Sequence, residues 1–178
     1  MPSPYLIPNR LPDVLAAIQV MGSHFWDSRE MKHWMENLGA KPQSADSWDE
    51  VFAAHPEFFG RDTVKDGRTL HVLRLRRSFE NTIDEKTRAE VSADEIERLK
   101  EAGEYQKTRK LSRPRLQASQ VEALMKTAIE LQVRAAALAD RRRFWATLTV
   151  PAVTGLFGGA LGYLLKGSGA LPETATKK

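Results

Sequence analysis

Cysteine is absent from the 178-residue sequence. Its absence excludes disulfide bonds, thiolate metal sites, iron–sulfur clusters and cysteine nucleophiles, and it fits a reducing compartment. The sequence also lacks a Gly-rich phosphate loop, a nucleophile elbow and a His-Glu zinc helix. His24 with Asp27, and His33 with Glu36, are close imidazole–carboxylate pairs, but each pair lacks a third metal ligand. We therefore expect a protein that is not an enzyme and that binds no cofactor and no metal.

A strong charge of one sign is also missing from most of the chain. Residues 1–83 hold 10 Lys and Arg against 11 Asp and Glu, and residues 84–118 hold 9 against 8. The net charge of +4 arises in residues 119–178, which hold 8 basic against 4 acidic residues. Because nucleic-acid-binding domains usually carry a basic surface of their own, this balance does not favour DNA or RNA as the partner.

One long run, residues 144–165, carries no charge over 22 positions. As a helix it would span about 33 Å, close to the thickness of the hydrocarbon core of a bilayer. The run therefore predicts a single transmembrane helix. Its moderate hydrophobicity, with Pro151, four glycines and three threonines, leaves a buried core helix or an interfacial hairpin as the alternative. Residues typical of the membrane interface stand at its two ends: Arg141, Arg142, Arg143, Trp145, Tyr163 and Lys166.

The start of the chain does not resemble a signal peptide. Residues 1–8 contain three prolines and no basic segment ahead of an apolar run. Without such a signal, export of about 140 folded residues is not expected, so we place residues 1–143 in the cytoplasm and residues 166–178 across the membrane. The expected protein is tail-anchored, with one span.

Small residues recur one helical turn apart within the apolar run, which lets two helix backbones approach closely. This spacing predicts a homo-oligomer that pairs through the span. The alternative is that glycine is simply common in membrane helices. The glycines concerned are Gly155, Gly158, Gly159 and Gly162.

Residues 119–143 predict a stalk helix that begins near Ser119. Its apolar residues follow alternating steps of three and four, which is the a/d pattern of a coiled coil. Two interpretations stay open: the stripe pairs with a second helix through Leu124, Leu131 and Leu138, or it covers the N-terminal domain of the same chain. The full stripe consists of Val121, Leu124, Ala128, Leu131, Ala135 and Leu138.

Residues 1–83 have the pattern of a small α+β domain. Apolar spacing and capping signals predict helices at 11–22, at 28–38 after an Asp27–Glu30 capping box, and at 47–55 after a Ser47–Glu50 capping box. A short extended stretch, His24-Phe25-Trp26, lies between the first two helices. The aromatic residues follow helix and strand faces, so we expect most of them in the core rather than in a base-stacking surface: Phe25, Trp26, Trp34, Trp48, Phe52, Phe58 and Phe59.

Two strands complete this domain. Phe58 and Phe59 begin the first, an Asp-Gly turn lies at residues 65–68, and residues 69–77 form the second strand. The order helix, strand, helix, helix, strand, turn, strand resembles a winged helix-turn-helix domain. The resemblance rests on topology alone, and it implies either DNA binding or a protein–protein module.

The two surfaces that would contact DNA in such a domain differ in charge. The third helix begins with Asp46, Asp49 and Glu50 and contains no Arg, Asn or Gln, which counts against reading of the major groove. The hairpin is basic and is the candidate surface for a phosphate backbone or an acidic protein. The alternative is an edge strand that charge protects from aggregation. Its candidate binding residues are Lys65, Arg68, Arg74, Arg76 and Arg77.

Residues 84–118 predict a polar connector. A capping box at Ser92 and Glu95 opens a short helix that ends at Gly103. A basic run follows that would attract anionic lipid headgroups if it reached the bilayer; a solvated hinge is the alternative. The run consists of Lys107, Arg109, Lys110, Arg113 and Arg115.

The leading hypothesis is a membrane-anchored interaction module whose cytoplasmic head binds a protein partner. A membrane-tethered regulator that binds nucleic acid through the basic hairpin is the first alternative. An oligomeric effector that permeabilises membranes, with the head as a sensor, is the second. The predicted segments are the head 1–83, the connector 84–118, the stalk 119–143, the span 144–165 and the tail 166–178.

Overall fold

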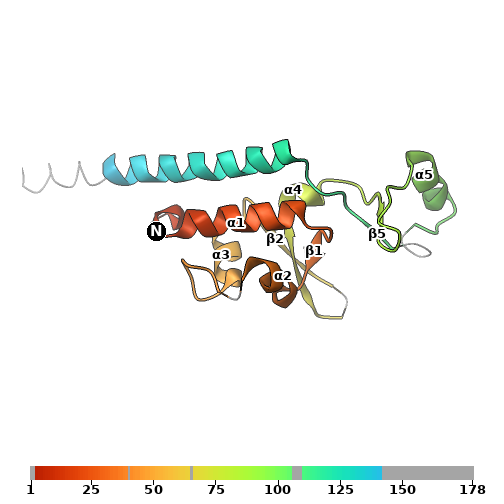
Figure 1. Ribbon diagram of the computed structural model, residues 1–178, viewed down its shortest axis with the longest axis horizontal. Helices are drawn as coiled ribbons and strands as arrows, with labels where there is room; N and C mark the ends of the chain where they lie inside the picture. Colours follow the sequence, from red (N-terminus) through yellow and green to blue (C-terminus); the bar gives the residue numbers. More distant parts are fainter. Residues whose placement is uncertain (1–2, 40, 65, 106–109, 142–178) are drawn as a thin grey trace, which may run out of the picture. The chain divides into compact units, whose positions relative to one another are not determined.

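The computed structural model describes residues 3–39, 41–64, 66–105 and 110–141 (Figure 1). These residues form a mixed α+β structure, as the sequence predicts. The predicted span 144–165 lies outside them. Within the described part of the chain, no helix is long and apolar enough to cross a membrane.

The elements follow one another in short segments, and one long helix at residues 118–141 comes last. The others are η1 Pro4–Leu6, α1 Arg10–Ser23, β1 Ser28–Arg29, α2 Met31–Leu38, α3 Trp48–Ala54, β2 Phe59–Thr63, β3 Thr69–Leu73, α4 Arg74–Arg77, β4 Ile83–Asp84, α5 Ala93–Glu101 and β5 Leu111–Ser112.

The main sheet has three antiparallel strands in the order β1-β3-β2. In β2 and β3, Phe59 lies opposite Leu73 and Thr63 opposite Thr69. The turn between them needs a left-handed residue, and Gly67 supplies it with φ 83°. The predicted hairpin is therefore confirmed, although its second strand is shorter than expected.

A single core joins the sheet to the helices. Val14, Ile18 and Met21 of α1 are fully buried beside Trp34 of α2. The Trp34 Nε1–H donates to the backbone oxygen of His71 at 3.0 Å, so the buried indole has its hydrogen bond. The expected aromatic core is confirmed for five side chains, while Phe25 and Trp26 are partly exposed. The five are Trp34, Trp48, Phe52, Phe58 and Phe59.

The capping signals are confirmed at two of three helices. Ser47 Oγ accepts from the Glu50 amide at 3.3 Å, and Ser92 Oγ accepts from the Glu95 amide at 3.4 Å. The third prediction, a capping box from Asp27 to Glu30, is wrong. Residues 28–29 form β1, and α2 begins only at Met31 without a side-chain cap. Asp27 instead accepts from the Arg113 Nη1–H at 2.5 Å, a partner far away in the sequence.

The predicted strand 69–77 ends early, at Leu73. Residues Arg74–Arg77 form the helical turn α4, so the expected alternation of leucine and arginine along a strand is wrong. The turn directs Arg76 inward, where its side chain is fully buried. The hydrogen bonds of Arg76, described below, provide the physical reason.

The connector contains more structure than its polar composition predicts. Strands β4 and β5 pair antiparallel, with Ile83 opposite Ser112. A second small core forms around Val91, Ile96 and Leu111, and Tyr105 packs against it. The chain therefore returns through β5 to the head instead of running on as an extended hinge.

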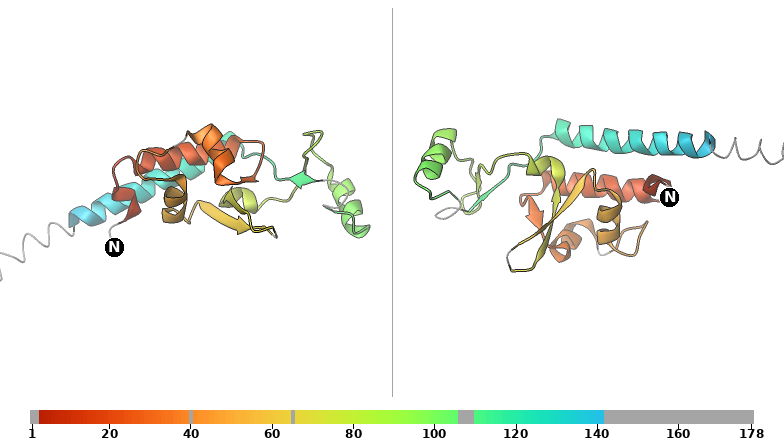
Figure 2. Two further views of the ribbon diagram at one scale, coloured as in Figure 1. Left: turned by 90° about the horizontal axis from the view of Figure 1, so that it is seen from below. Right: turned by 180° about the vertical axis from the view of Figure 1, so that it is seen from behind.

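The first part of the helix 118–141 lies along α1 and runs antiparallel to it (Figures 1 and 2). Val121 and Ala128 are buried in the main core, and Leu124, Leu131 and Ala135 pack against it. Up to residue 135, the apolar stripe therefore covers the domain of the same chain. Pairing between two chains through Leu124, Leu131 and Leu138 is not tested by this packing and stays a prediction.

Candidate functional site

Two exposed arginines of the predicted hairpin, Arg68 and Arg77, form ion pairs within the chain. Arg68 binds Asp66 at 2.6 Å and Glu30 at 3.3 Å. Hydrogen bonds from Arg68 lower the pKa of Asp66. Arg77 binds Asp62 at 2.6 Å. Each of these exposed ion pairs contributes little to stability. Together they neutralise positive charge that would otherwise be available to bind a phosphate backbone.

The remaining hairpin candidates differ in their surroundings. Lys65 lies outside the described residues. Arg74 is exposed, and its Nε–H donates to the backbone oxygen of Phe59 at 3.3 Å. Arg76 is fully buried and cannot contact a partner directly, which corrects its assignment as a binding residue.

Arg76 acts as a buried link between three segments. Its Nη1 group donates to the backbone oxygens of Met21, His24 and Trp26 at 2.8 to 3.0 Å. Its Nη2 group donates to the backbone oxygens of Phe25 and Arg113, and its Nε–H donates to the backbone oxygen of Pro114. These three distances are 2.9 to 3.2 Å. Burial lowers the pKa of Arg76 to about 10, so the group stays protonated at neutral pH.

The acidic start of α3 is engaged within the chain, by one ion pair to Arg61 and by a contact with the buried His71. Asp49 lies 3.2 Å from Nε2 of the buried His71 and 3.6 Å from the guanidinium of Arg61. Burial lowers the pKa of His71, so its imidazole is neutral at pH 7. No basic side chain of α3 faces outward, because the helix contains none. This geometry does not suit insertion into a major groove.

A polar cluster ties the N-terminal segment to the turn after α3. Tyr5 donates a hydrogen bond to Glu57, and Nδ1 of the buried His55 lies 3.1 Å from the same carboxylate. Burial raises the pKa of Tyr5 well above its ordinary value, so the phenol stays protonated. No group of three or more potential metal ligands occurs among the described residues.

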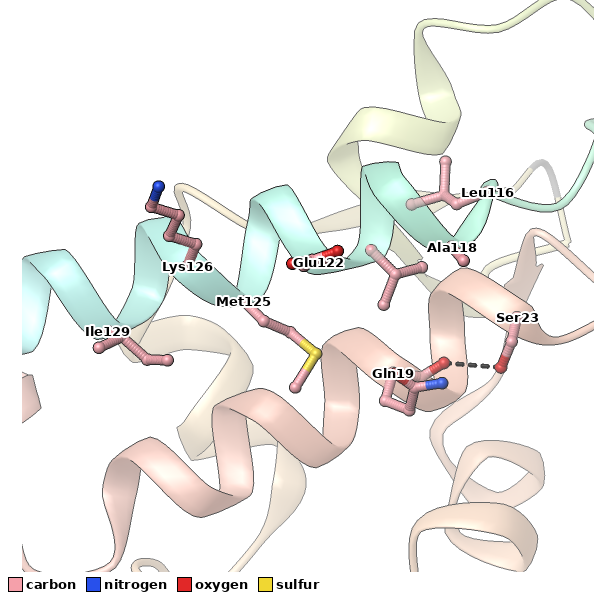
Figure 3. Close-up of a pocket in the computed structure, with 9 residues that line it drawn as sticks. Gln19, Ser23, Leu116, Ala118, Glu122, Met125, Lys126 and Ile129 are labelled. Atoms are coloured by element: carbon pink, nitrogen blue, oxygen red, sulfur yellow. Dashed lines mark hydrogen bonds between the residues drawn. The ribbon is translucent and has the colours of Figure 1, made fainter.

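A groove of about 590 Å³ lies between α1 and the helix that follows β5 (Figure 3). The Met125 side chain points from this helix toward α1 and lines the groove (Figure 3). Glu122 and Lys126 carry opposite charges on its rim, and neither forms an ion pair within the described residues. Its further lining residues are Gln19, Ser23, Leu116, Ala118, Val121 and Ile129.

A smaller pocket of about 250 Å³ is basic and aromatic. The guanidinium groups of Arg88 and Arg115 lie 5.3 and 5.9 Å from the centre of the Phe25 ring. Arg113, which also lines it, pairs with Asp27. The sequence showed Arg113 and Arg115 only as part of a basic run; their meeting with Arg88 and Phe25 depends on the pairing of β4 with β5.

Comparison of the chain with protein-family models, curated proteins and solved structures finds no significant match. The assignment of function therefore rests on the geometry of these sites.

The other predicted site residues fall into two groups. Leu124 and Leu131 are partly buried against the core, Leu138 is 59% exposed, and Arg141 is exposed at the end of the described helix. The remaining residues lie outside the described part: Arg142, Arg143, Trp145, Gly155, Gly158, Gly159, Gly162, Tyr163 and Lys166.

Proposed function

We propose that this protein is a non-enzymatic, membrane-anchored interaction module whose winged-helix-like head binds a cytoplasmic protein. The uncharged run 144–165 is its single transmembrane helix, and the glycine spacing in that run associates copies of the chain into a homo-oligomer. The observation that carries the choice of a protein partner is the charge arrangement of the head. Of the described hairpin arginines, Arg68 and Arg77 are paired within the chain and Arg76 is buried, which leaves only Arg74 exposed without an ion pair. Because α3 also begins with acids, the apolar groove is the favoured partner surface.

The winged-helix assignment is supported by topology. The order α1, β1, α2, α3, β2, β3 and the sheet order β1-β3-β2 place a hairpin beside three helices. In this assignment the β2–β3 turn is the wing. The same topology serves proteins that bind DNA and proteins that bind other proteins, so the surface decides between them.

The groove between α1 and residues 118–135 is the proposed partner site. Its walls are mainly apolar, and its rim carries Glu122 and Lys126 without partners of their own among the described residues. An amphipathic helix fits this chemistry, because it can insert one apolar anchor against Met125 while presenting charges of both signs to the rim. The partner is therefore expected to contribute a helix with an apolar face and mixed charge.

The membrane assignment is tested by alkaline carbonate extraction. The full chain should stay in the membrane pellet after the wash, because a spanning helix is not released by charge neutralisation. Release into the supernatant would contradict the anchor while leaving the head's binding activity to be tested separately.

The partner site is tested by site-specific photo-crosslinking in cells. A photoreactive residue at Ile129, in the groove, should form an adduct with one protein that mass spectrometry can identify. The matched control is a photoreactive residue at Val133, which lies on the same helix, is 61% exposed and does not line the groove. The identified protein, purified, should bind the full chain and should lose at least tenfold in affinity for Ile129→Asp but not for Val133→Asp. Equal effects at the two positions would refute the groove as the binding site.

The nucleic-acid alternative is tested on the exposed hairpin. Arg68→Glu combined with Arg74→Glu reverses two exposed charges and leaves Arg76 in place. If the head bound DNA or RNA through the wing, this variant would lose affinity and show a shallower salt dependence. We expect the chain to show no such salt-dependent retention before or after the change.

A further inference from the structure

The pocket formed by Phe25, Ile83, Arg88, Arg113 and Arg115 has a chemistry that the proposed partner site does not explain. It combines three guanidinium groups with an aromatic ring in about 250 Å³. This volume is below the range of about 300–1,000 Å³ typical of pockets for drug-sized ligands, so it suits a small group. We propose that this pocket binds a phosphate monoester, independently of the groove.

The charges around the pocket leave two cations available. Arg113 pairs with Asp27, and its Nε–H donates to the backbone oxygen of Phe79 at 3.1 Å. Its charge is therefore already neutralised. The guanidinium groups of Arg88 and Arg115 form no ion pair and no hydrogen bond within the described residues, and both side chains contact Phe25. Two free positive charges match a phosphate monoester, which carries a charge of about −1.5 to −2 at pH 7.

Cation–π contacts with Phe25 orient these two exposed guanidinium groups before a ligand arrives. Guanidinium groups stack on aromatic faces and keep their N–H edges free, and those edges match phosphate oxygens in pairs. Phe25 thus limits the freedom of both arginines, and less ordering is needed on binding. Behind them, Arg76 fixes the backbone of Phe25 and Arg113 through hydrogen bonds to both.

The backbone of Arg88 provides a second, independent observation. Arg88 has φ 59°, a left-handed conformation that glycine adopts without strain and other residues adopt at a cost in stability. The turn that enforces it is closed by Asp84, whose Oδ1 accepts from the amides of Lys86 and Thr87 at 2.8 and 2.9 Å. Backbone strain of this kind concentrates at ligand sites. A ligand-binding role for the side chain therefore explains an arginine at this strained position.

The phosphate could belong to a soluble ester or to a lipid headgroup, and the two sources share the same recognition chemistry. Isothermal titration of the full chain in a nonionic detergent distinguishes them with two probes. Glycerol phosphate represents the soluble source, and dioctanoyl phosphatidic acid represents the lipid source. Dioctanoyl phosphatidylcholine, which has no phosphate monoester, is the control ligand. Binding of either phosphate monoester supports the site and names its source; binding of neither overturns it.

Variants locate the binding. Arg88→Gln with Arg115→Gln should weaken the affinity for the bound probe at least tenfold, since both free cations are lost. Arg98→Gln with Arg134→Gln is the matched control, because it removes the same charge from exposed arginines on α5 and on the helix 118–141. An equal loss in the control would show general charge attraction and would overturn the proposal.

Two further variants separate recognition from folding. Arg88→Lys with Arg115→Lys keeps the charge but removes the planar fork, and it should bind clearly more weakly than the natural chain. Arg88→Gly relieves the left-handed strain, so its melting temperature should be equal or higher while its affinity for the probe falls. If Arg88→Gly bound the probe as tightly as the natural chain does, a role for this arginine would be refuted.

Discussion

The sharpest structural prediction concerns Arg76→Met. The substitution removes five N–H donors and leaves six backbone oxygens to find other partners, among them Met21 in the buried core. Taking about 1.5 kcal/mol for each hydrogen bond from a charged donor gives a gross loss of about 9 kcal/mol. The pKa of Arg76, lowered by burial to about 10, corresponds to roughly 3 kcal/mol of desolvation that methionine does not require.

The difference, about 6 kcal/mol, is an upper limit, because five of the six hydrogen bonds are only partly buried and water can replace the donor there. We therefore expect Arg76→Met to lower the free energy of unfolding by about 3–5 kcal/mol, a large part of the stability of an ordinary domain. Arg76→Lys keeps the charge with three donors and should fall between the natural chain and Arg76→Met.

Urea unfolding of the full chain in nonionic detergent, followed by tryptophan fluorescence, measures this loss. Arg74→Met is the matched control, since it removes an exposed arginine from the same helical turn and should change stability by no more than about 0.5 kcal/mol. Equal midpoints for Arg76→Met and Arg74→Met would refute the role of Arg76 as a buried link.

Three further predictions follow from individual contacts. Gly22→Ala would place a methyl group 2.9 Å from Cγ2 of Val121, so it should cost about 1 kcal/mol of stability. Combining it with Val121→Ala should remove most of that penalty. If the effects of the two substitutions on urea unfolding were additive, the contact would be contradicted. His71 is buried and its pKa is lowered, so below about pH 6.5 the unfolded chain binds more protons than the folded chain, and the stability falls as the pH drops. In thermal melts at pH 5 to 7, His71→Gln should reduce the slope of stability against pH. An unchanged slope would exclude His71 as its source. Ser47→Ala removes the cap on the Glu50 amide and should cost about 1 kcal/mol. Ser119→Ala, at an exposed serine whose hydroxyl forms no hydrogen bond within the described residues, should be nearly neutral in the same assay.

Local signals predicted the three main helices and the hairpin of the head, but not α4 or the position of β1 at Ser28–Arg29. Ser47 and Ser92 carry caps that depend on an amide three residues away. The Asp-Gly turn depends on the left-handed Gly67 and on Asp66, which accepts a hydrogen bond from the Arg68 amide. Because these interactions join residues that are close in the sequence, the local sequence pattern predicts them directly.

The sites were less predictable, because they join distant segments. The basic run indicated an anion-binding tendency for Arg113 and Arg115, but nothing local brings Phe25 and Arg88 to them. Asp27 had the spacing of a capping residue, and it binds Arg113, 86 residues later, instead. A charge-assisted bond in a partly buried place is stronger than an exposed cap, which explains why the distant partner replaced the local one.

The sequence by itself determined the three main helices and the β2–β3 hairpin of the head, that charge is nearly balanced there, and that one uncharged run is long enough to predict a membrane span. The tertiary structure decided which arginines are buried, paired or free, and it placed the stripe of residues 121–135 on the head of the same chain. The reason is physical: whether a side chain such as Arg76 is buried depends on backbone oxygens that lie 37 to 55 residues away, and only the folded chain brings them together.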